Sequence, residues 1–455
     1  MAKMFDTALR VDAAGPGGIP VLNNLRFLRH PAWYVLDRIA PEHPGPVVPL
    51  TRGNGSVVLL RGEEAVRRYF TDNDVFHRLS DGLFTLPEGR PWSRMFDAVL
   101  TFNGEQHRRA RKLLMPIVHK SAMEHYAEVF AVTFKRTRFA AADGEPFDMV
   151  AEFLDITRAN MLICLLGLEP DEENVRLAHA VHRLLQATLN PMVFMYQQER
   201  AWTPYGRWTR QVAGVYDRLA EIIERKRAEE PRRDALSILC HTIDENGDSL
   251  TTPEIAGELH GLFVAGFETT AMSMTWALLT ILGTPGLEVS DQEQLDAVVR
   301  ESQRLIPTVP LSLPRRVTRE VEIKGAPPIP AGALAFAAPL LEHRDPVAFP
   351  DPGAFLPSRW TDARPSPYAF LPFGVGQRRC LGASFADLQI RTTLALILAS
   401  GRPRLLTTEV DYQIKSGATA FPKKPIMVSM GSGPSAAAGP VTGTVTKLWN
   451  RPAAG

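Results

Sequence analysis

The chain has 455 residues, of which 45% are hydrophobic and 22% are charged, the balance of an ordinary soluble globular protein. This composition excludes a disordered chain and provides enough apolar side chains for a large core. Lys and Arg number 51 against 50 Asp and Glu, so the formal net charge of +1 argues against nucleic-acid binding by the whole protein.

The cysteine content and the apolar runs bear on the compartment. Three cysteines, Cys164, Cys240 and Cys380, are too few for a disulfide framework and suit a reducing environment. The N-terminus lacks the apolar core of a signal peptide, and no run of about 18 apolar residues predicts a transmembrane helix. We therefore expect a cytoplasmic protein with no membrane span.

The N-terminal third changes from irregular to regular patterns. Residues 1–50 are rich in Pro and Gly and predict an irregular segment, which is followed by a strand at about 57–62 and a helix directly behind it. Residues 74–104 contain several Gly and Pro and predict a long loop. A helix-rich stretch extends from about 105 to 305 without a repeat or a linker, so we expect one large domain.

A long apolar helix dominates the middle of the chain. It is predicted to begin at Thr252 with a capping hydroxyl, and it is apolar on nearly all sides to about residue 278, which is typical of a buried helix. Within it, Gly266 weakens the helix by about 1 kcal/mol relative to Ala. Glu268 costs several kcal/mol to bury unless it is paired or neutral. An acid beside Thr269 in such a helix therefore needs an explanation.

The C-terminal half combines a helix, short strands and a tail. A helix at about 291–305 contains Glu301 and Arg304, spaced as an i,i+3 ion pair. Short β-like pieces and Pro-rich turns follow Pro307. From about 430 the small and polar residues predict disorder. We expect one folded domain at 1–430 and a disordered tail at 431–455.

Cys380 is predicted to lie at the start of a helix, directly after a loop that contains Gly374 and Gly376. Backbone N–H groups, the helix dipole, Arg378 and Arg379 are expected to favour its thiolate. These local features leave two interpretations open, a reactive thiol and a structural cysteine. A lone thiolate can also ligate iron if a macrocycle supplies the other ligands, as in haem.

The segment Phe373-Gly-Val-Gly-Gln-Arg-Arg-Cys380-Leu-Gly382 resembles the haem-ligand loop of the cytochrome P-450 haem-thiolate family, soluble bacterial type. Four further motifs resemble that family in order and spacing: His107-x-x-x-Arg111, Ala265-Gly-Phe-Glu-Thr-Thr270, Glu301-x-x-Arg304 and the Pro-x-Arg segment ending at Arg359. The resemblance spans residues 107–382. It implies a single large cytochrome P-450 fold of the α+β type, mainly α with a minor β part, with haem between the long central helix and the Cys-loop helix.

The resemblance also implies roles for individual residues. Cys380 would ligate the iron of haem b (iron protoporphyrin IX), Glu268 would relay protons, and Thr269 would hydrogen-bond the reacting oxygen. The alternative for Thr269 is a hydrogen bond to a helix carbonyl. Gly376 and Gly382 would let the backbone approach the macrocycle. The other cofactor-binding residues would be His107, Arg111, Arg315 (with Arg316 as its alternative), Phe373, Gly374, Arg378 and Gly382.

The implied activity is a monooxygenase reaction on a mainly apolar organic substrate in biosynthesis. Electrons would come from NAD(P)H through ferredoxin and ferredoxin reductase, or flavodoxin. The substrate would contact Leu83, Phe84, Val264, Ala265, Val309 and Leu311. The partner would dock on a basic face formed by Arg108, Arg109, Lys112, Lys120 and Arg379.

Two alternatives remain at this stage. One is a peroxide-dependent oxidase or an isomerase of the same fold, and the other is a non-catalytic haem sensor. The first commonly lacks the pair of Glu268 and Thr269, and the second has no use for it. The pair therefore favours the monooxygenase.

Overall fold

The structure is a computed structural model, and it describes residues 20–449 except 52–53, 80–85, 142, 189, 191–192, 194–196, 363, 402, 416–417 and 432–439. As predicted, the chain is mainly α with a minor β part. The α-helices are α1 Pro20–Arg29, α2 Pro31–Tyr34, α3 Ala40–Glu42, α4 Glu63–Thr71, α5 Gly104–Leu114, α6 Lys120–Phe134, α7 Arg138–Ala141, α8 Met149–Leu166, α9 Glu172–Thr188, α11 Pro204–Ala228, α12 Ala235–His241, α13 Thr252–Gly283, α14 Gln292–Leu305, α15 Pro339–Glu342, α16 Arg359–Asp362 and α17 Ala383–Ala399.

The strands are β1 Val47–Thr51, β2 Asn54–Leu60, β3 Phe76–Arg78, β4 Phe147–Asp148, β5 Arg315–Val317, β6 Leu334–Ala337, β7 Arg404–Leu405, β8 Tyr412–Lys415, β9 Thr419–Pro422 and β10 Met427–Ser429. Short helical turns of other types are η2 Val35–Ile39, η3 Pro91–Arg94, η4 Met115–Val118, η5 Gly376–Arg378 and η6 Thr444–Lys447.

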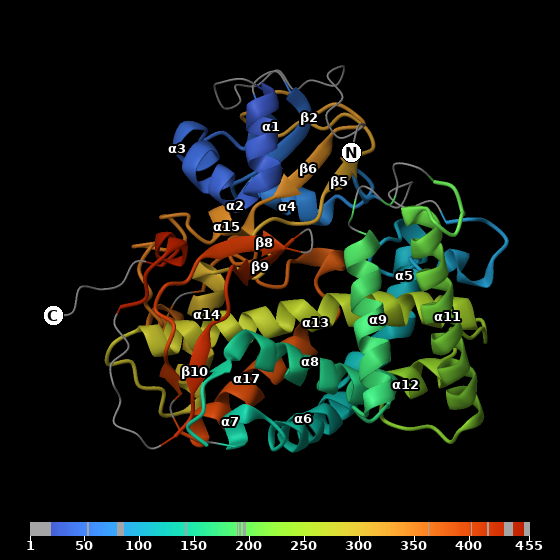
Figure 1. Ribbon diagram of the computed structural model, residues 1–455. Helices are drawn as coiled ribbons and strands as arrows, with labels where there is room; N and C mark the ends of the chain where they lie inside the picture. The colour runs from blue at the N-terminus through green and yellow to red at the C-terminus, as the bar shows by residue number, and fades with distance from the viewer. Residues whose placement is uncertain are drawn as a thin grey trace.

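Helix α13 crosses the molecule as its central element (Figure 1), and α8, α9, α11, α14 and α17 pack against it. A capping box fixes its start: the Thr251 hydroxyl accepts the Glu254 N–H, and the Glu254 carboxylate accepts the Thr251 N–H. The cap is therefore Thr251, one residue before the predicted Thr252. Among the described helices, α13 alone is long and apolar enough to cross a membrane, but 67% of its most apolar window is buried in protein, as in a core helix.

A five-stranded sheet with the order β1-β2-β6-β5-β3 lies beside α1 and α4 at the top of Figure 1. β2 and β6 are parallel, and the other neighbouring strands are antiparallel. Strand β3 lies inside the predicted loop 74–104. Its register places Arg78 opposite Arg315 of β5, so two basic residues from distant parts of the sequence become neighbours.

The buried pair Glu301 and Arg304 connects α14 to the segment before the Cys380 loop. Arg304 donates to both carboxylate oxygens of Glu301, at 2.8 and 3.0 Å. Arg359 and the indole N–H of Trp360 also donate to Glu301, each at 3.0 Å. A carboxylate with this many donors offsets the cost of burying the charges. The pair is thus part of a structural network rather than an exposed ion pair.

Residues 440–449 of the predicted tail are ordered and pack into the core. Trp449 and Val441 lie against the end of α13, where a Cβ on Gly283 would be 2.7 Å from the indole and 2.9 Å from the valine. Arg344 donates to the Leu448 carbonyl at 2.9 Å. The prediction of a disordered tail from 431 is therefore wrong for these residues, because a few apolar side chains among small polar ones suffice to anchor them.

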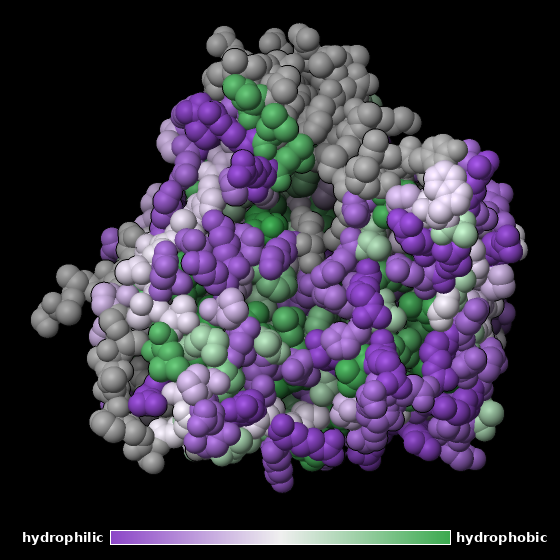
Figure 2. Space-filling model, in the orientation of Figure 1, coloured by the Kyte–Doolittle hydropathy of each residue, from purple (hydrophilic) through white to green (hydrophobic). Residues whose placement is uncertain are grey.

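The N-terminal segment is more regular than predicted, because residues 20–51 form α1 to α3 and β1. Helix α1 is amphipathic: Phe27 is buried, whereas Leu22, Leu25 and Leu28 are exposed. Figure 2 shows the resulting band of apolar atoms over α1. The prediction of an irregular segment relied on Pro and Gly content and overlooked this periodicity.

Candidate functional site

Cys380 lies in the loop between η5 and α17. Its N–H donates to the Phe373 carbonyl at 2.9 Å, which closes the loop. Gly374 and Gly376 have φ values of +64° and +74°, in the region that favours glycine. A Cβ on Gly376 would lie 2.9 Å from a backbone oxygen of α4, whereas one on Gly382 would meet no atom within 4 Å. Gly376 thus serves the turn and the contact with α4, and the approach of the backbone to a macrocycle at Gly376 and Gly382 stays a prediction.

The electrostatics around Cys380 differ from the prediction. Desolvation raises the pKa of the Cys380 thiol, while the Gly382 N–H and the charges of Arg379 and Arg111 lower it. Arg378 is not among the groups that shift this pKa, and its guanidinium donates to the Phe102 carbonyl and the Asn103 side chain just before α5. Cys380 is nevertheless exposed in the loop, and the Gly382 N–H, Arg379 and Arg111 act in the predicted direction. A metal ion that replaces the thiol proton would add to this stabilisation of the thiolate.

Three arginines gather beside His107. Arg378 donates to the Asn103 side-chain oxygen at 2.9 Å, and the same oxygen accepts the Arg78 N–H at 2.8 Å. Arg315 donates to a backbone carbonyl of α4 and lies 4.4 Å from the centre of the Tyr69 ring, as measured from its guanidinium carbon. Arg315 is fully buried and its neighbour Arg316 is exposed. Arg315, and not its alternative Arg316, therefore belongs to the cluster.

These groups perturb one another. Burial, followed by the charges of Arg78 and Arg315, lowers the pKa of Arg378 to about 9. Burial is the largest cause for His107 as well, and together with the neighbouring arginines it lowers the His107 pKa to about 4. His107 is thus a neutral donor at pH 7. Arg111, one turn later on α5, donates to the Arg379 carbonyl at 2.8 Å and so reaches the Cys380 loop.

The arginine cluster requires an anion. Within the described part of the chain, no carboxylate is an ion-pair partner of Arg78, Arg315 or Arg378. Buried guanidinium nitrogens of all three arginines have no hydrogen-bond partner. Unpaired buried cations are costly, and carboxylates that accept two parallel bonds match guanidinium groups well. The two propionates of haem therefore fit this donor set.

Sequence reasoning missed two members of this site, Arg78 and Asn103. Arg78 stood in a segment predicted as a loop, and only its register with β5 places it beside Arg315. The Asn103 side chain connects Arg78 with Arg378, and it also donates to the Arg78 carbonyl at 3.1 Å. Asn103 directly precedes α5, where Asn is a common N-cap. This position at a helix start was the one sequence signal that could have drawn attention to Asn103.

The central turns of α13 present different residues to different neighbours. A Cβ on Gly266 would lie 3.1 Å from the Met161 side chain, so this glycine allows α8 to approach and Met161 fills the space. The Thr269 hydroxyl donates to the Ala265 carbonyl at 2.6 Å, which is the backbone bond weighed as the alternative. Ala265 is exposed and Thr269 is half-buried in a helix that is otherwise largely buried. This face of α13 is therefore accessible.

Glu268 points from α13 toward α9. Its Oε1 lies 3.5 Å from Nε2 of His182, and 8% of its side chain is exposed. A basic partner thus offsets part of the cost of burying the acid. This partner could not be predicted from sequence, because His182 belongs to a different helix.

The predicted substrate contacts are only partly accessible. Leu83 and Phe84 lie outside the described residues. Val264 and Val309 are half-buried, and Ala265 is exposed. Leu311 is 7% exposed and packs into the hydrophobic cluster beneath α1, so it does not offer the predicted contact surface.

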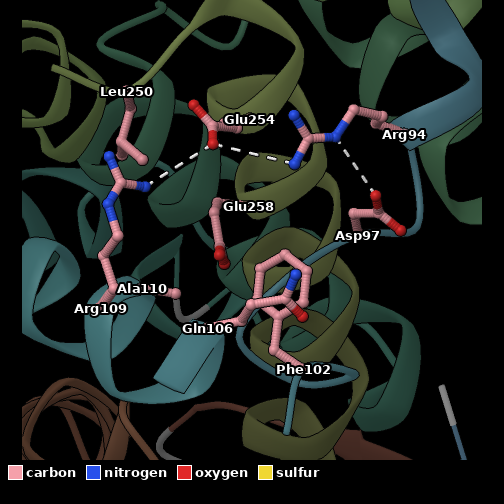
Figure 3. A pocket seen from close by; sticks show the side chains of 9 residues that line it. All are labelled: Arg94, Asp97, Phe102, Gln106, Arg109, Ala110, Leu250, Glu254 and Glu258. Carbon is pink, nitrogen blue, oxygen red and sulfur yellow. Dashed lines mark hydrogen bonds and ion pairs between the residues drawn. The ribbon is translucent and has the colours of Figure 1, made fainter. Parts of the chain in front are cut away.

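A separate cavity of about 210 Å³ lies between α5, the η3 region and the start of α13 (Figure 3). Arg94 and Arg109 approach Glu254 across it, at 3.8 and 3.6 Å. Deeper in, the Glu258 carboxylate accepts the Val99 N–H at 2.9 and 3.1 Å. Burial raises the pKa of Glu258 to about 7. The cavity contains none of the predicted cofactor or substrate residues, and its charged side chains are engaged with one another.

The predicted basic docking face is largely neutralised. Its ion pairs are Arg108 with Glu105, Arg109 with Asp244, Lys112 with Glu245 and Lys120 with Glu124. Of the five cations, Arg379 alone forms no ion pair with a described residue. The sequence contains the cations but does not indicate which acids fold against them.

Comparisons with known proteins agree with the motifs. The profile of the family described as Cytochrome P450 matches residues 14–293 and 287–430. A protein of Mycobacterium tuberculosis named putative cytochrome P450 135B1 is 30% identical over 385 residues, which cover 78% of each chain. Another from the same species, putative cytochrome P450 138, is 29% identical over 362 residues, covering 76% of this chain and 79% of the relative.

Solved structures share the fold. Cyanobacterial CYP120A1 with bound retinoic acid superposes with a TM-score of 0.73 at 23% identity, over 93% of this chain and all of that one. P450BioI, in complex with an acyl carrier protein that bears hexadec-9Z-enoic acid, superposes with a TM-score of 0.71 at 21% identity, over 89% of this chain and all of that one. CYP109E1 from Bacillus megaterium, in complex with corticosterone, superposes with a TM-score of 0.67 at 20% identity, over 90% of this chain and all of that one.

Proposed function

The chain belongs to the cytochrome P450 family and is therefore a haem-dependent monooxygenase, and we propose that it oxidises a mainly apolar organic molecule in a cytoplasmic biosynthetic pathway. One observation supports the placement of the cofactor most strongly: the buried guanidinium groups without anions, beside the Cys380 loop. Haem b bound through a thiolate supplies the iron chemistry that activates dioxygen. Electrons come from NAD(P)H through ferredoxin reductase and ferredoxin, or through flavodoxin.

In this proposal the haem domain spans residues 1–430, joined by the packed segment 440–449. Cys380 ligates the iron, and the loop residues Phe373, Gly374 and Gly382 shape the surface around it. Arg111, Arg315 and Arg378 hold the two propionates with their positive charges, His107 holds them as a neutral donor, and Arg78 joins them.

Glu268 and Thr269 hold and move the protons that the reaction consumes. The Glu268 carboxyl binds a proton near the accessible face of α13. A hydroxyl has one donor and two acceptor sites. Thr269 can therefore accept a hydrogen bond at Oγ1 while its own hydroxyl hydrogen is still donated to the Ala265 carbonyl.

The proposed substrate is elongated and mainly apolar. Val264 and Ala265, on the same turns of α13 as Thr269, and Val309 offer apolar contacts, and the predicted contacts Leu83 and Phe84 lie outside the described residues. Retinoic acid, a hexadecenoic acyl chain and corticosterone, the ligands named for proteins of the same fold, are likewise mainly apolar. A panel of these three compounds, scored by the shift of ferric haem from low to high spin, tests the class.

The ligand assignment is tested by the reduced, carbon-monoxide-bound spectrum. Cys380→Ala should abolish the thiolate-type band, because the mutation removes the sulfur. Cys164→Ala and Cys240→Ala serve as matched controls and should keep the band, since both cysteines are buried in hydrophobic clusters whereas Cys380 is exposed. A band that survives in Cys380→Ala and disappears in either control would overturn the assignment.

The propionate site is tested by the rate at which the holoenzyme loses haem to an acceptor protein. Arg78→Ala should accelerate the loss about ten- to a hundredfold, the equivalent of one charge-assisted hydrogen bond of about 1.5–3 kcal/mol. Arg316→Ala, an exposed neighbour on β5, is the control and should leave the rate unchanged. Equal rates for the two variants would contradict the role of Arg78.

A further inference from the structure

Helix α9 crosses α13 next to the proposed proton-delivery pair (Figure 1). There, Nε2 of His182 lies 3.5 Å from Oε1 of Glu268. The ring of His182 stands edge-on to the Phe267 ring, with the centroids 5.1 Å apart and the planes at 82°. The amide nitrogen of Gln186 lies 2.8 Å from the same Nε2. These contacts fix the imidazole between the acid of α13 and the surface of α9.

Exposure to solvent increases from α13 outward. The side chain of Glu268 is 8% exposed, that of His182 is 20% exposed, and Gln186 is exposed. Water therefore reaches the imidazole more readily than the carboxylate. Imidazole binds a proton and imidazolium releases one near physiological pH, so a histidine at this place can do both.

The charges around His182 come from three helices. Glu268 faces it from α13, Arg158 from α8, and Arg183 lies beside it on α9. Burial, Arg158 and Arg183 lower the pKa of His182, so its imidazolium is a stronger acid than that of free histidine. His179, one turn earlier on α9, interacts with the same two arginines, with Asp155 of α8 and with His182 itself.

We propose that His182 passes protons from the solvent to the Glu268 carboxylate, an inference that rests on the proposed role of Glu268 and Thr269 in proton delivery. In each transfer the Nε2–H bond of the imidazolium breaks and an O–H bond forms at Glu268 Oε1. In the neutral imidazole the freed Nε2 accepts the Gln186 amide N–H, and a proton from hydronium or a buffer acid then binds to this Nε2 and restores the imidazolium. No electrons move in this step. His182 acts through Glu268 and is a positioning residue with respect to the reacting atoms.

A titration without turnover tests the coupling of the two groups. The probe is the reduced carbon-monoxide complex of the holoenzyme labelled with ¹³C-histidine, followed by NMR against pH. In Glu268→Gln the proton affinity of His182 should fall about threefold or more, because the carboxylate no longer stabilises the imidazolium. His179, which interacts with His182 but has no ion pair with Glu268 among the described contacts, is the internal control and should shift much less than His182. An unchanged titration of His182 would overturn the inference.

Oxygen reduction provides the second test and needs no identified substrate. The enzyme is supplied with NADPH, a surrogate ferredoxin and its reductase, and the electrons recovered in hydrogen peroxide and in water are compared. His182→Gln should lower the share recovered in water about tenfold at pH 7, within the usual range for proton transfer by a side chain. In His182→Gln the division of electrons between hydrogen peroxide and water should also lose the pH dependence that the wild type shows. His179→Gln should behave like the wild type.

His182→Arg separates a relay from a structural ion pair. Arginine keeps a positive charge opposite Glu268 but does not release its proton at pH 7. A relay therefore fails in His182→Arg as it does in His182→Gln, and a wild-type partition in His182→Arg would overturn the inference. If the wild type itself shows no thiolate-type band, the proposed function fails. A wild type with that band and the same partition as His182→Gln refutes the relay alone.

Discussion

Glu258 provides a stability prediction that can be worked out from its surroundings. It lies on α13 at the floor of the cavity in Figure 3 and holds the 95–103 segment through two contacts to the Val99 N–H, at 2.9 and 3.1 Å. Burial is the largest cause of its raised pKa, which moves from 4.5 to about 7, and Glu254 adds to it. In Glu258→Gln, the amide oxygen can still accept the Val99 N–H, but the side chain no longer titrates.

The sign follows from proton binding. Between pH 4.5 and 7 the folded protein keeps the Glu258 proton while the unfolded chain releases it, so the free energy of unfolding falls as the pH rises. The shift corresponds to at most about 3 kcal/mol at 1.36 kcal/mol per pH unit. Glu258→Gln does not titrate and so does not lose stability in this way. The free energy of unfolding of Glu258→Gln minus that of the wild type should therefore increase by up to about 3 kcal/mol from pH 5 to pH 8.

Urea unfolding of the holoenzyme at several pH values measures this difference. Glu342, whose pKa burial also raises to about 7, should behave in the same way when changed to Gln. Glu124→Gln, on the exposed side of α6, is the control and should show no pH-dependent difference. If Glu258→Gln followed the wild type at every pH, or lost stability at high pH, the reasoning would be refuted.

Three further predictions concern other parts of the molecule. Thr269→Ala should divert NAD(P)H toward hydrogen peroxide and change substrate binding by about 1 kcal/mol or less, as measured by product and peroxide formed per NAD(P)H. Trp449→Ala should lower the free energy of unfolding by about 3–5 kcal/mol in urea titrations, because the indole is fully buried against Gly283; wild-type stability would contradict an anchored tail. Glu301→Gln should cost about 3–5 kcal/mol, since two buried guanidinium groups lose their carboxylate; a smaller loss than for Glu124→Gln would exclude the network.

The sequence predicted those parts of the site whose chemistry lies within a short segment. His107 and Arg111 are one helical turn apart, and the closed loop around Cys380 depends on glycines only a few residues away. Such contacts follow from local geometry. The start of α13 was accurate to one residue because its capping signal is local as well.

Contacts between distant segments could not be predicted in this way. Arg78 joins Arg315 through the register of two strands, and His182 meets Glu268 where two helices cross. Neither position has a distinctive neighbour in the sequence. The same limit applies to Gly266, because the sequence does not reveal that Met161 of α8 fills the space beside it.

The arginine cluster connects the fold to its cofactor. Arg78 and Arg315 come from the sheet, and Arg378 comes from the Cys380 loop, so three segments that are distant in the sequence bring like charges together. Desolvation of all three arginines, and the repulsion that Arg315 and Arg378 experience from their neighbours, lower their pKa values and oppose folding. Anions that bind only to the assembled cluster remove that opposition and stabilise the folded state by mass action. In the proposed function these anions are the propionates. The residues that position the cofactor therefore also make the association of the sheet with the Cys380 loop depend on it.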